Sequence, residues 1–164
     1  MARSELPSHN VLVMRFSALG DVAMTIPVLY PVCRANPATR FVMLTKPWPA
    51  SMFHDRPDNL MVVGVDFKQE CKGALGLIRL AARLRNQYGI DAVADLHNVL
   101  RSSVIAFYMH LHGIPVARLD KERKHRKALV THRTSDPVTP THNRYLNVFK
   151  QLGLQVADDF TRMF

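Results

Sequence analysis

Short apolar runs alternate along the chain with longer segments in which apolar residues recur every three or four positions. Runs of the first kind are typical of buried strands, and segments of the second kind are typical of helices that bury one face. The pattern predicts strands at 10–15, 40–44, 60–65, 91–96 and 115–119, helices at 21–35, 74–88, 99–111 and 142–152, and a short helix between Trp48 and His54. Strands that alternate with helices in this order indicate parallel βαβ units.

Two of these helices differ in regularity. The helix at 74–88 has an apolar stripe at helical spacing, and Gly89 is placed to end it. The helix at 21–35 contains Pro27 and Pro31, which lack the N–H that a helix interior requires. We therefore expect the helix at 21–35 to be kinked or broken.

Five strands joined by right-handed crossovers predict an α/β fold: a doubly wound, Rossmann-like parallel sheet in the order 3-2-1-4-5, with helices on both faces. The 164 residues fit a single domain over 10–154, with a tail at 1–9 and the start of a linker or C-terminal segment at 155–164. No apolar run reaches the roughly 18 residues of a membrane-spanning helix, and the polar N-terminus has no apolar signal core. This predicts a cytoplasmic protein, in which Cys33 and Cys71 are free thiols.

The turn after the first strand is the first place to look for chemistry. Ser17 and Gly20 lie in it, and Asp21 opens the following helix. The carboxyl ends of parallel strands form the edge at which α/β folds bind ligands. Asp21 can act there as a base, or its carboxylate can stabilise the helix N-terminus, and the spacing leaves both interpretations open. A dinucleotide site is disfavoured because Gly20 stands alone where a G-x-G-x-x-G loop needs three glycines.

The chain carries a net charge of +9, which indicates an anionic partner such as a nucleic acid, an anionic membrane face or a phosphorylated substrate. One segment, opposed only by Glu122, concentrates this charge: Lys121, Arg123, Lys124, Arg126, Lys127 and Arg133. A solvated basic loop is the alternative explanation for this segment. The eight histidines show no metal-ligand spacing, so no metal site is predicted.

Further polar residues follow the later strands and open the later helices. They are Lys46 after the second strand, His97 and Arg101 after the fourth, and His142 and Arg144 at the start of the last helix. A cation is unfavourable for the dipole at a helix start, so Arg101 suggests a ligand. The residues that follow strands project onto the ligand-binding edge. They predict a crevice there that is lined by cations and by the carboxylate of Asp21. Asp95 ends a strand and is either a buried structural partner or a second carboxylate of the site; its place in the strand pattern favours the structural role.

Three stretches of the sequence carry a family likeness. They are Arg15-Phe16-Ser17-Ala18-Leu19-Gly20-Asp21-Val22 with Thr25-Ile26-Pro27, Asp91-Ala92-Val93-Ala94-Asp95-Leu96-His97 with Arg101-Ser102-Ser103, and His142-Asn143-Arg144-Tyr145 before Phe149-Lys150-Gln151-Leu152-Gly153. In these stretches the chain resembles the bacterial ADP-heptose:lipopolysaccharide heptosyltransferases of glycosyltransferase family nine. The likeness as a whole covers nearly all of residues 10–154.

The resemblance implies a GT-B architecture, in which two Rossmann-like domains face a cleft. The family's N-terminal domain holds the acceptor, an anionic lipid A core with acidic Kdo sugars, and its C-terminal domain binds the ADP-sugar. Asp21 is then the implied general base of an inverting transfer, with no cofactor and no metal. Acceptor binding is expected at the cationic edge: Ser17, Gly20, Lys46, His97, Arg101, Lys121, Arg123, Lys124, Arg126, His142 and Arg144.

The family's nucleotide-sugar signature, a late Asp-x-Gly-Pro-type turn with a following His, is absent from this sequence. We therefore expect an acceptor-side domain that is inactive alone, whose ADP-sugar donor binds a C-terminal domain outside the chain. We expect this domain in the cytoplasm or peripherally at the inner membrane. The alternative is a non-catalytic basic module for nucleic acid or an anionic membrane surface, although no nucleic-acid motif is present. A Rossmann-like cofactor-binding enzyme is a third and weaker option.

Overall fold

The computed structural model describes residues 9–121, 127, 129–131 and 140–156, and within them five parallel strands form one sheet. The strands are β1 (His9–Met14), β2 (Thr39–Thr45), β3 (Leu60–Gly64), β4 (Ala92–Asp95) and β5 (Val116–Arg118). Their order is β3-β2-β1-β4-β5, so the predicted sheet order is confirmed. Every predicted strand is present, and its ends lie within one residue of the prediction.

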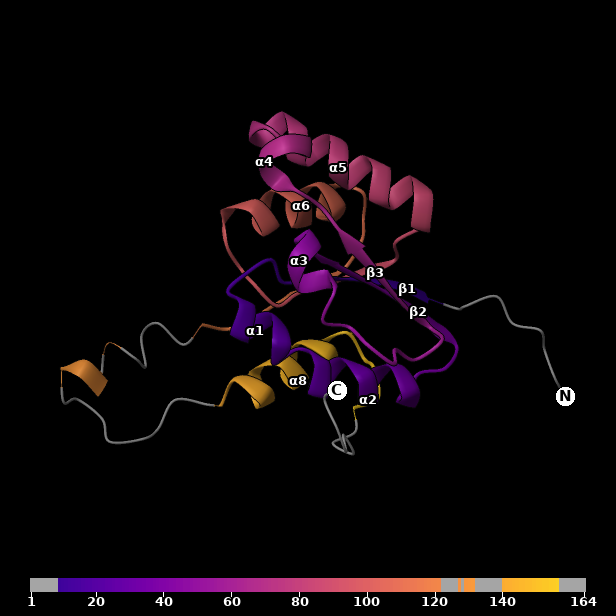
Figure 1. Ribbon diagram of the computed structural model, residues 1–164, viewed down its shortest axis with the longest axis vertical. Coiled ribbons are helices and arrows are strands. Elements are labelled where there is room, and N and C mark those ends of the chain that lie inside the picture. The colour runs from indigo at the N-terminus through magenta and orange to yellow at the C-terminus, as the bar shows by residue number, and fades with distance from the viewer. Residues whose placement is uncertain (1–8, 122–126, 128, 132–139, 157–164) are drawn as a thin grey trace, which may run out of the picture.

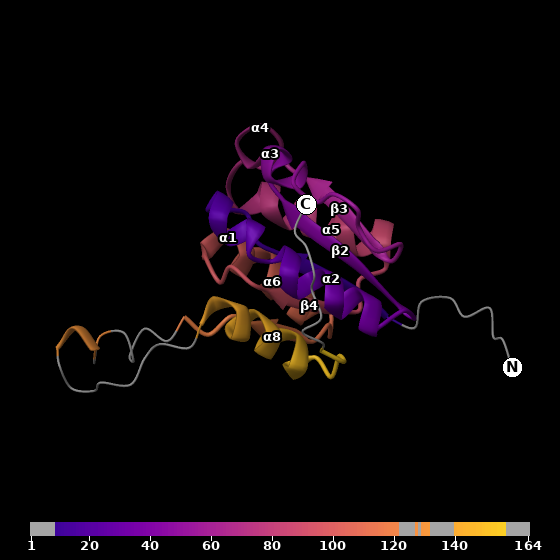
Figure 2. The same cartoon turned by 60° about the horizontal axis from the view of Figure 1, so that its bottom comes forward.

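Helices cover both faces of the sheet, which confirms the doubly wound arrangement (Figures 1 and 2). The first face carries α1 (Leu19–Ala23), α2 (Ile26–Ala35) and α8 (Thr141–Gln151), and the second carries α4 (Phe67–Glu70), α5 (Gly73–Tyr88) and α6 (Leu100–Leu111). A short helix, α3 (Pro47–Ala50), follows β2. No helix in the described ranges has the length and hydropathy needed to cross a membrane.

The central strand β1 supplies side chains to two separate cores. Val11 and Val13 belong to the apolar cluster under α2 and α8, whereas Leu12 and Met14 belong to the cluster under α5 and α6. Successive side chains of a strand point to opposite faces, so a strand covered on both sides must be apolar at every position. The unbroken apolar run of this strand is therefore a consequence of its central place. Cys33 and Cys71 are buried free thiols in the two cores, as predicted.

The predicted helix at 21–35 is broken, as its prolines indicate. Helix α1 ends at Ala23, and α2 begins at Ile26 with Pro27 in its first turn, where no N–H is needed. The Thr25 hydroxyl donates a hydrogen bond of 2.6 Å to the Val22 carbonyl between the two helices. Helix α1 is therefore a separate unit of five residues.

Helix α4 is an element that the apolar pattern does not predict. Its four residues are too few to show a helical period. Its start is defined by polar contacts instead: Asp66 Oδ1 accepts hydrogen bonds from the N–H groups of Lys68 and Gln69, at 3.0 and 3.3 Å. A side-chain cap of this kind satisfies N–H groups that lack a partner in the first turn.

Helix α8 depends on Phe149 for its place on the sheet. This side chain is completely buried and lies 6.4 Å, between ring centroids, from Phe41 of β2. We expect Phe149→Ala to lower the free energy of unfolding by about 3–5 kcal/mol because it leaves a cavity under the helix. Urea denaturation measures this change. Lys150→Ala, an exposed neighbour on the same helix, is the control and should change stability by less than about 0.5 kcal/mol; equal losses would show that Phe149 does not anchor the helix.

Candidate active site

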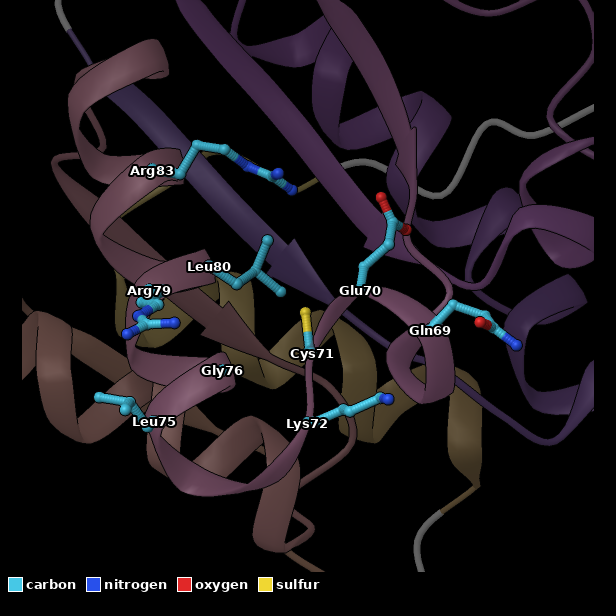
Figure 3. Close-up of a pocket in the computed structure, with 9 residues that line it drawn as sticks. All are labelled: Gln69, Glu70, Cys71, Lys72, Leu75, Gly76, Arg79, Leu80 and Arg83. Atoms are coloured by element: carbon cyan, nitrogen blue, oxygen red, sulfur yellow. The ribbon is translucent and has the colours of Figure 1, made fainter.

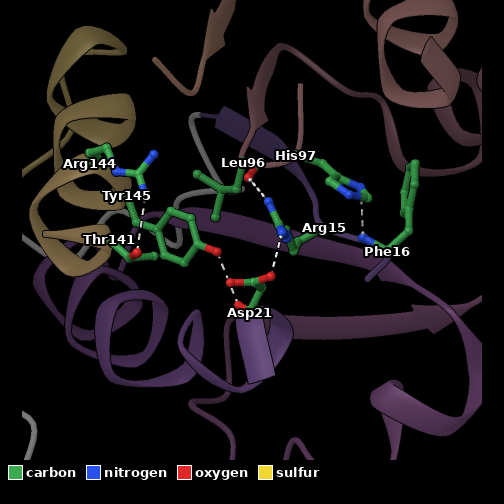
Figure 4. A network of polar contacts seen from close by, with 8 residues as sticks. All are labelled: Arg15, Phe16, Asp21, Leu96, His97, Thr141, Arg144 and Tyr145. Atoms are coloured by element: carbon green, nitrogen blue, oxygen red, sulfur yellow. Dashed lines mark hydrogen bonds and ion pairs between the residues drawn. The ribbon is translucent and has the colours of Figure 1, made fainter. Parts of the chain in front are cut away.

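A polar pocket of about 250 Å³ lies at the edge where β1, β4 and β5 end. It is lined by Arg15, Asp21, His97, Val99, Leu119, Lys121, Thr141, Arg144 and Tyr145. Figure 4 shows six of these residues: Arg15, Asp21, His97, Thr141, Arg144 and Tyr145. Arg15 directly follows β1, and Asp21 lies in α1. The next four residues follow β4 and β5, and the last three come from α8. The carboxyl edge of the sheet therefore carries the pocket, as the fold class predicts.

Arg15 connects three parts of this edge. One terminal nitrogen, Nη1, donates a hydrogen bond of 3.0 Å to the Leu96 carbonyl, just beyond the end of β4. The other, Nη2, lies 2.9 Å from Asp21 Oδ2 in α1. The Arg15 side chain is only 12% exposed, so its charge is largely removed from water and depends on these partners.

The Asp21 side chain is 46% exposed and faces the pocket beside Arg15 (Figure 4). Within the described chain, no N–H of α1 donates a hydrogen bond to this carboxylate, although Asp21 lies in the first turn of the helix. Asp21 therefore does not cap its own helix. Its carboxylate pairs with Arg15 through Oδ2 instead. Its other oxygen, Oδ1, has no hydrogen-bond or ion-pair partner among the described residues.

Tyr145 fixes the backbone of Asp21 from the far end of the sequence. Its ring is completely buried, and its hydroxyl donates a hydrogen bond of 3.1 Å to the Asp21 carbonyl. Burial raises the pKa of the Tyr145 phenol, which keeps the hydroxyl protonated as a donor. Helix α8 thereby positions α1, although more than a hundred residues separate the two in sequence.

His97 is held as a neutral ring at the side of the pocket. Its Nδ1 accepts a hydrogen bond of 3.3 Å from the Phe16 N–H, so in the neutral ring the proton belongs on Nε2. Burial, followed by the positive charges of Arg15 and Lys121, lowers the pKa of His97 to about 4. The ring can therefore donate a hydrogen bond from Nε2 at neutral pH without carrying a charge.

Asp95 shapes the loop that carries His97. It is completely buried, and its Oδ1 accepts hydrogen bonds from the N–H groups of His97 and Asn98, at 3.0 and 2.8 Å. Asn98 has a φ of 50°, a left-handed conformation that this contact supports. Asp95 thus has a buried structural position, in agreement with the expectation from its place at a strand end.

Positive charge dominates the pocket. Arg15, Lys121 and Arg144 line it together with a single carboxylate, Asp21. Two contacts orient Arg144 from α8: its Nη2 donates to the Thr141 hydroxyl at 3.1 Å, and its Nη1 reaches the Asp120 carbonyl at 3.5 Å. An excess of fixed cations suits an anionic ligand that carries carboxylate or phosphate groups.

Four of the predicted site residues therefore line one pocket: Asp21, His97, Lys121 and Arg144. Five others do not line it: Ser17, Gly20, Lys46, Arg101 and His142. Lys46 precedes α3 and is close enough to lower the pKa of His97, whereas Gly20 is exposed with open space around it. Arg101 lies over the Phe67 ring, with its Cζ atom 5.6 Å from the ring centroid, toward α4. Arg123, Lys124 and Arg126 fall outside the described residues.

Five residues of the pocket are absent from the sequence prediction of the site: Arg15, Val99, Leu119, Thr141 and Tyr145. Two of them, Arg15 and Tyr145, hold Asp21 in place. Both lie within stretches that carry the family likeness: Arg15 begins the first stretch, and Tyr145 ends the His142–Tyr145 part of the last. Arg15 directly follows β1, so the rule that polar residues after strands face the ligand-binding edge could also have indicated it. Tyr145 lies on the buried face of its helix, which is typical of a core residue, so only the family likeness could have drawn attention to it. In the described ranges, no group of three or more histidine, cysteine, aspartate and glutamate side chains could hold a metal ion.

The fold is similar to that of several solved glycosyltransferases. It matches a glycosyl transferase family 9 protein from Veillonella parvula DSM 2008 with a TM-score of 0.65 and 22% identity, over 98% of this chain and 45% of that one. It matches E. coli heptosyltransferase WaaC, solved with ADP, with a TM-score of 0.59 and 20% identity, over 94% of this chain and 52% of that one. A ugt transferase from Siraitia grosvenorii in complex with UDP matches with a TM-score of 0.51 and 10% identity, over 89% of this chain and 40% of that one.

These likenesses concern the fold. The chain has the Rossmann-like fold of one half of a GT-B glycosyltransferase, and it spans about half the length of the solved proteins named above. No protein-family model matches the chain, and no curated protein matches its sequence. The expected α/β class and GT-B type of fold are thereby confirmed.

The lowered pKa of His97 predicts a pH-dependent stability. The value of about 4 in the native state lies below the ordinary 6.5, so between these values the unfolded chain binds more protons and stability falls as the pH falls. We expect His97 to account for a loss of about 2 kcal/mol between about pH 8 and about pH 5. Urea denaturation of the wild type and of His97→Gln at both pH values isolates this contribution. If the variant lost as much stability on acidification as the wild type, His97 would not be buried in its neutral form.

Proposed function

We propose that this chain is the acceptor-binding half of an inverting glycosyltransferase that transfers heptose from ADP-heptose to the inner core of lipopolysaccharide. The observation that carries the proposal is a half-exposed carboxylate, Asp21, set by Arg15 in a cationic pocket at the ligand-binding edge of the sheet. The fold shared with solved glycosyltransferases and the three stretches that resemble heptosyltransferases support it.

Asp21 is proposed as the general base. One carboxylate oxygen, Oδ2, is held by Arg15, and Oδ1 is left to accept the proton of an acceptor hydroxyl. The hydroxyl oxygen attacks the anomeric carbon of heptose as its proton moves to Asp21, and a new glycosidic bond forms with inversion. The bond from that carbon to the phosphate oxygen breaks, and ADP leaves with the electron pair.

The cations of the pocket are proposed to hold the acceptor rather than the donor. Lys121 and Arg144 lie around the pocket on the side of β5 and α8, and a lipid A core with Kdo sugars brings carboxylate and phosphate groups. Arg123, Lys124 and Arg126 follow Lys121 in sequence and are proposed to extend the same binding region. The neutral His97 ring adds a donor, Nε2–H, for an uncharged hydroxyl of the acceptor.

The donor site is proposed to lie in a second Rossmann-like half outside this chain. The support is twofold: the chain spans about half the length of solved proteins with this fold, and it lacks the nucleotide-sugar turn. Catalysis then requires both halves, and this half alone binds the acceptor without turning it over.

The base assignment predicts a selective loss of turnover. In a two-half enzyme that contains this chain, we expect Asp21→Asn to lower kcat by at least about 100-fold, because the amide cannot take up the proton. The amide oxygen still accepts from Arg15, so the KM for the acceptor should change by no more than about threefold. Steady-state kinetics with ADP-heptose and a Kdo-lipid A acceptor measures both. Near-normal turnover in Asp21→Asn would remove Asp21 from this role.

Acceptor binding can be measured on the 164-residue chain itself. We expect Arg144→Gln to weaken binding of Kdo-lipid A in neutral detergent micelles by about tenfold, because one charge-assisted hydrogen bond is lost. Titration calorimetry measures the affinity. The matched control is Arg34→Gln, an exposed arginine in the last turn of α2, which should bind like the wild type. Equal affinities of Arg144→Gln and the wild type would place the acceptor elsewhere.

A further inference from the structure

Helix α6 is apolar on both of its sides. The inner side packs into the core through Ser102, Ile105, Ala106 and Met109. The outer side carries Leu100, Val104, Phe107 and Leu111, whose spacing forms one stripe along the helix. Leu100 is 82% exposed, Phe107 59% and Leu111 66%. A surface helix ordinarily turns polar residues to water, so an outer apolar stripe marks a surface that binds something.

Helix α5 widens this apolar surface. It lies beside α6 in both views of the molecule (Figures 1 and 2), and it exposes Leu75 and Ile78. An apolar hollow of about 280 Å³ between the helices is lined by Ile78, Ser103, Val104, Phe107, Tyr108 and Leu111. We call the surface formed by Leu75, Ile78, Leu100, Val104, Phe107 and Leu111 the α5–α6 face.

The charged side chains of α5 and α6 are all positive. The two helices contain Arg79, Arg83, Arg85 and Arg101, and neither contains an aspartate or a glutamate. Next to Leu75, a cavity of about 500 Å³ is lined in part by Lys72, Arg79 and Arg83 (Figure 3). Glu70 also lines that cavity, but one of its carboxylate oxygens accepts a hydrogen bond of 2.7 Å from the Asp66 N–H at the start of α4.

We propose that the α5–α6 face binds the surface of a bilayer that contains anionic phospholipids. Apolar side chains bordered by arginine and lysine are typical of helices that lie in a membrane interface. The apolar stripe enters the boundary between head groups and acyl chains, and the arginines pair with lipid phosphates. A second copy of the chain is a poor occupant because the arginines of α5 and α6 in the two copies repel each other.

The α5–α6 face and the polar pocket adjoin each other in the sequence. Val99 lines the site pocket, and Leu100, the next residue, begins the apolar stripe of α6. Docking through the α5–α6 face therefore brings the carboxyl edge of the sheet close to the head groups. The inference uses none of the proposed catalytic chemistry and is tested without it.

Vesicle sedimentation tests the proposal on the 164-residue chain. We expect the wild type to bind vesicles made of equal parts phosphatidylcholine and phosphatidylglycerol, and to bind pure phosphatidylcholine at least about tenfold more weakly. The double variant Phe107→Asn/Leu111→Asn should weaken binding to the mixed vesicles by about tenfold or more, because two exposed apolar side chains no longer enter the interface. Arg79→Glu/Arg83→Glu should weaken it by a similar factor.

Controls on the other side of the sheet separate this face from a general effect of charge. Met24→Gln changes an exposed methionine between α1 and α2, and Lys150→Glu changes an exposed lysine of α8. Both variants should bind vesicles like the wild type. Circular dichroism checks that each variant is folded. The proposal is overturned if the wild type fails to bind mixed vesicles or if the α5–α6 variants bind normally. Neutralising Lys121, Arg123, Lys124 and Arg126 tests the basic segment: if this abolishes vesicle binding that the α5–α6 variants retain, the proposal is overturned. It is also overturned if sedimentation equilibrium shows a dimer that Phe107→Asn/Leu111→Asn dissociates.

Discussion

The site depends on one largely buried guanidinium. Arg15 joins the end of β1 to the Leu96 carbonyl beyond β4 and to the carboxylate of Asp21 in α1. A charge withdrawn from water is costly unless it is paired, so the three segments must meet in one geometry for the two terminal nitrogens of Arg15 to find their partners. The same contacts that stabilise Arg15 therefore determine where the Asp21 carboxylate lies.

Other contacts around the pocket position residues in the same indirect way. Tyr145 donates to the Asp21 carbonyl, and Asp95 accepts from the N–H groups that begin the loop of His97. In both cases a buried polar atom, the Tyr145 hydroxyl or Asp95 Oδ1, pairs with backbone rather than with a ligand, so the pocket is formed before a ligand arrives. Preorganised groups of this kind do not need to reorganise when charge develops during a reaction.

The sequence predicts the sheet well and the site in part, for physical reasons that differ. A strand such as β1, covered on both faces, must be apolar throughout, and this leaves a clear pattern in the sequence. The carboxyl ends of parallel strands share one edge, so Asp21, His97 and Lys121 could be brought together by topology alone. Arg101 shows a limit of such predictions. Successive side chains of a helix differ in direction by about 100°, so a residue in the first turn of a helix need not face the site. Arg101 lies over the Phe67 ring and does not line the pocket. Tyr145 shows another limit, since helical periodicity places its ring in the core and says nothing of its hydroxyl.

The polar pocket and the apolar outer side of α6 suit the two ends of an amphiphilic ligand. A glycolipid acceptor offers charged sugars to a cationic pocket while its acyl chains remain in a bilayer. A protein that binds the same bilayer meets this acceptor in a thin layer instead of in the whole solution, which raises the effective concentration of the acceptor without any new contact at the site. Under these proposals the pocket has to hold only the polar part of the acceptor, because the membrane holds its acyl chains. The two surfaces also adjoin in the chain: Val99 lines the pocket, and the exposed Leu100 follows it at the start of the apolar stripe of α6.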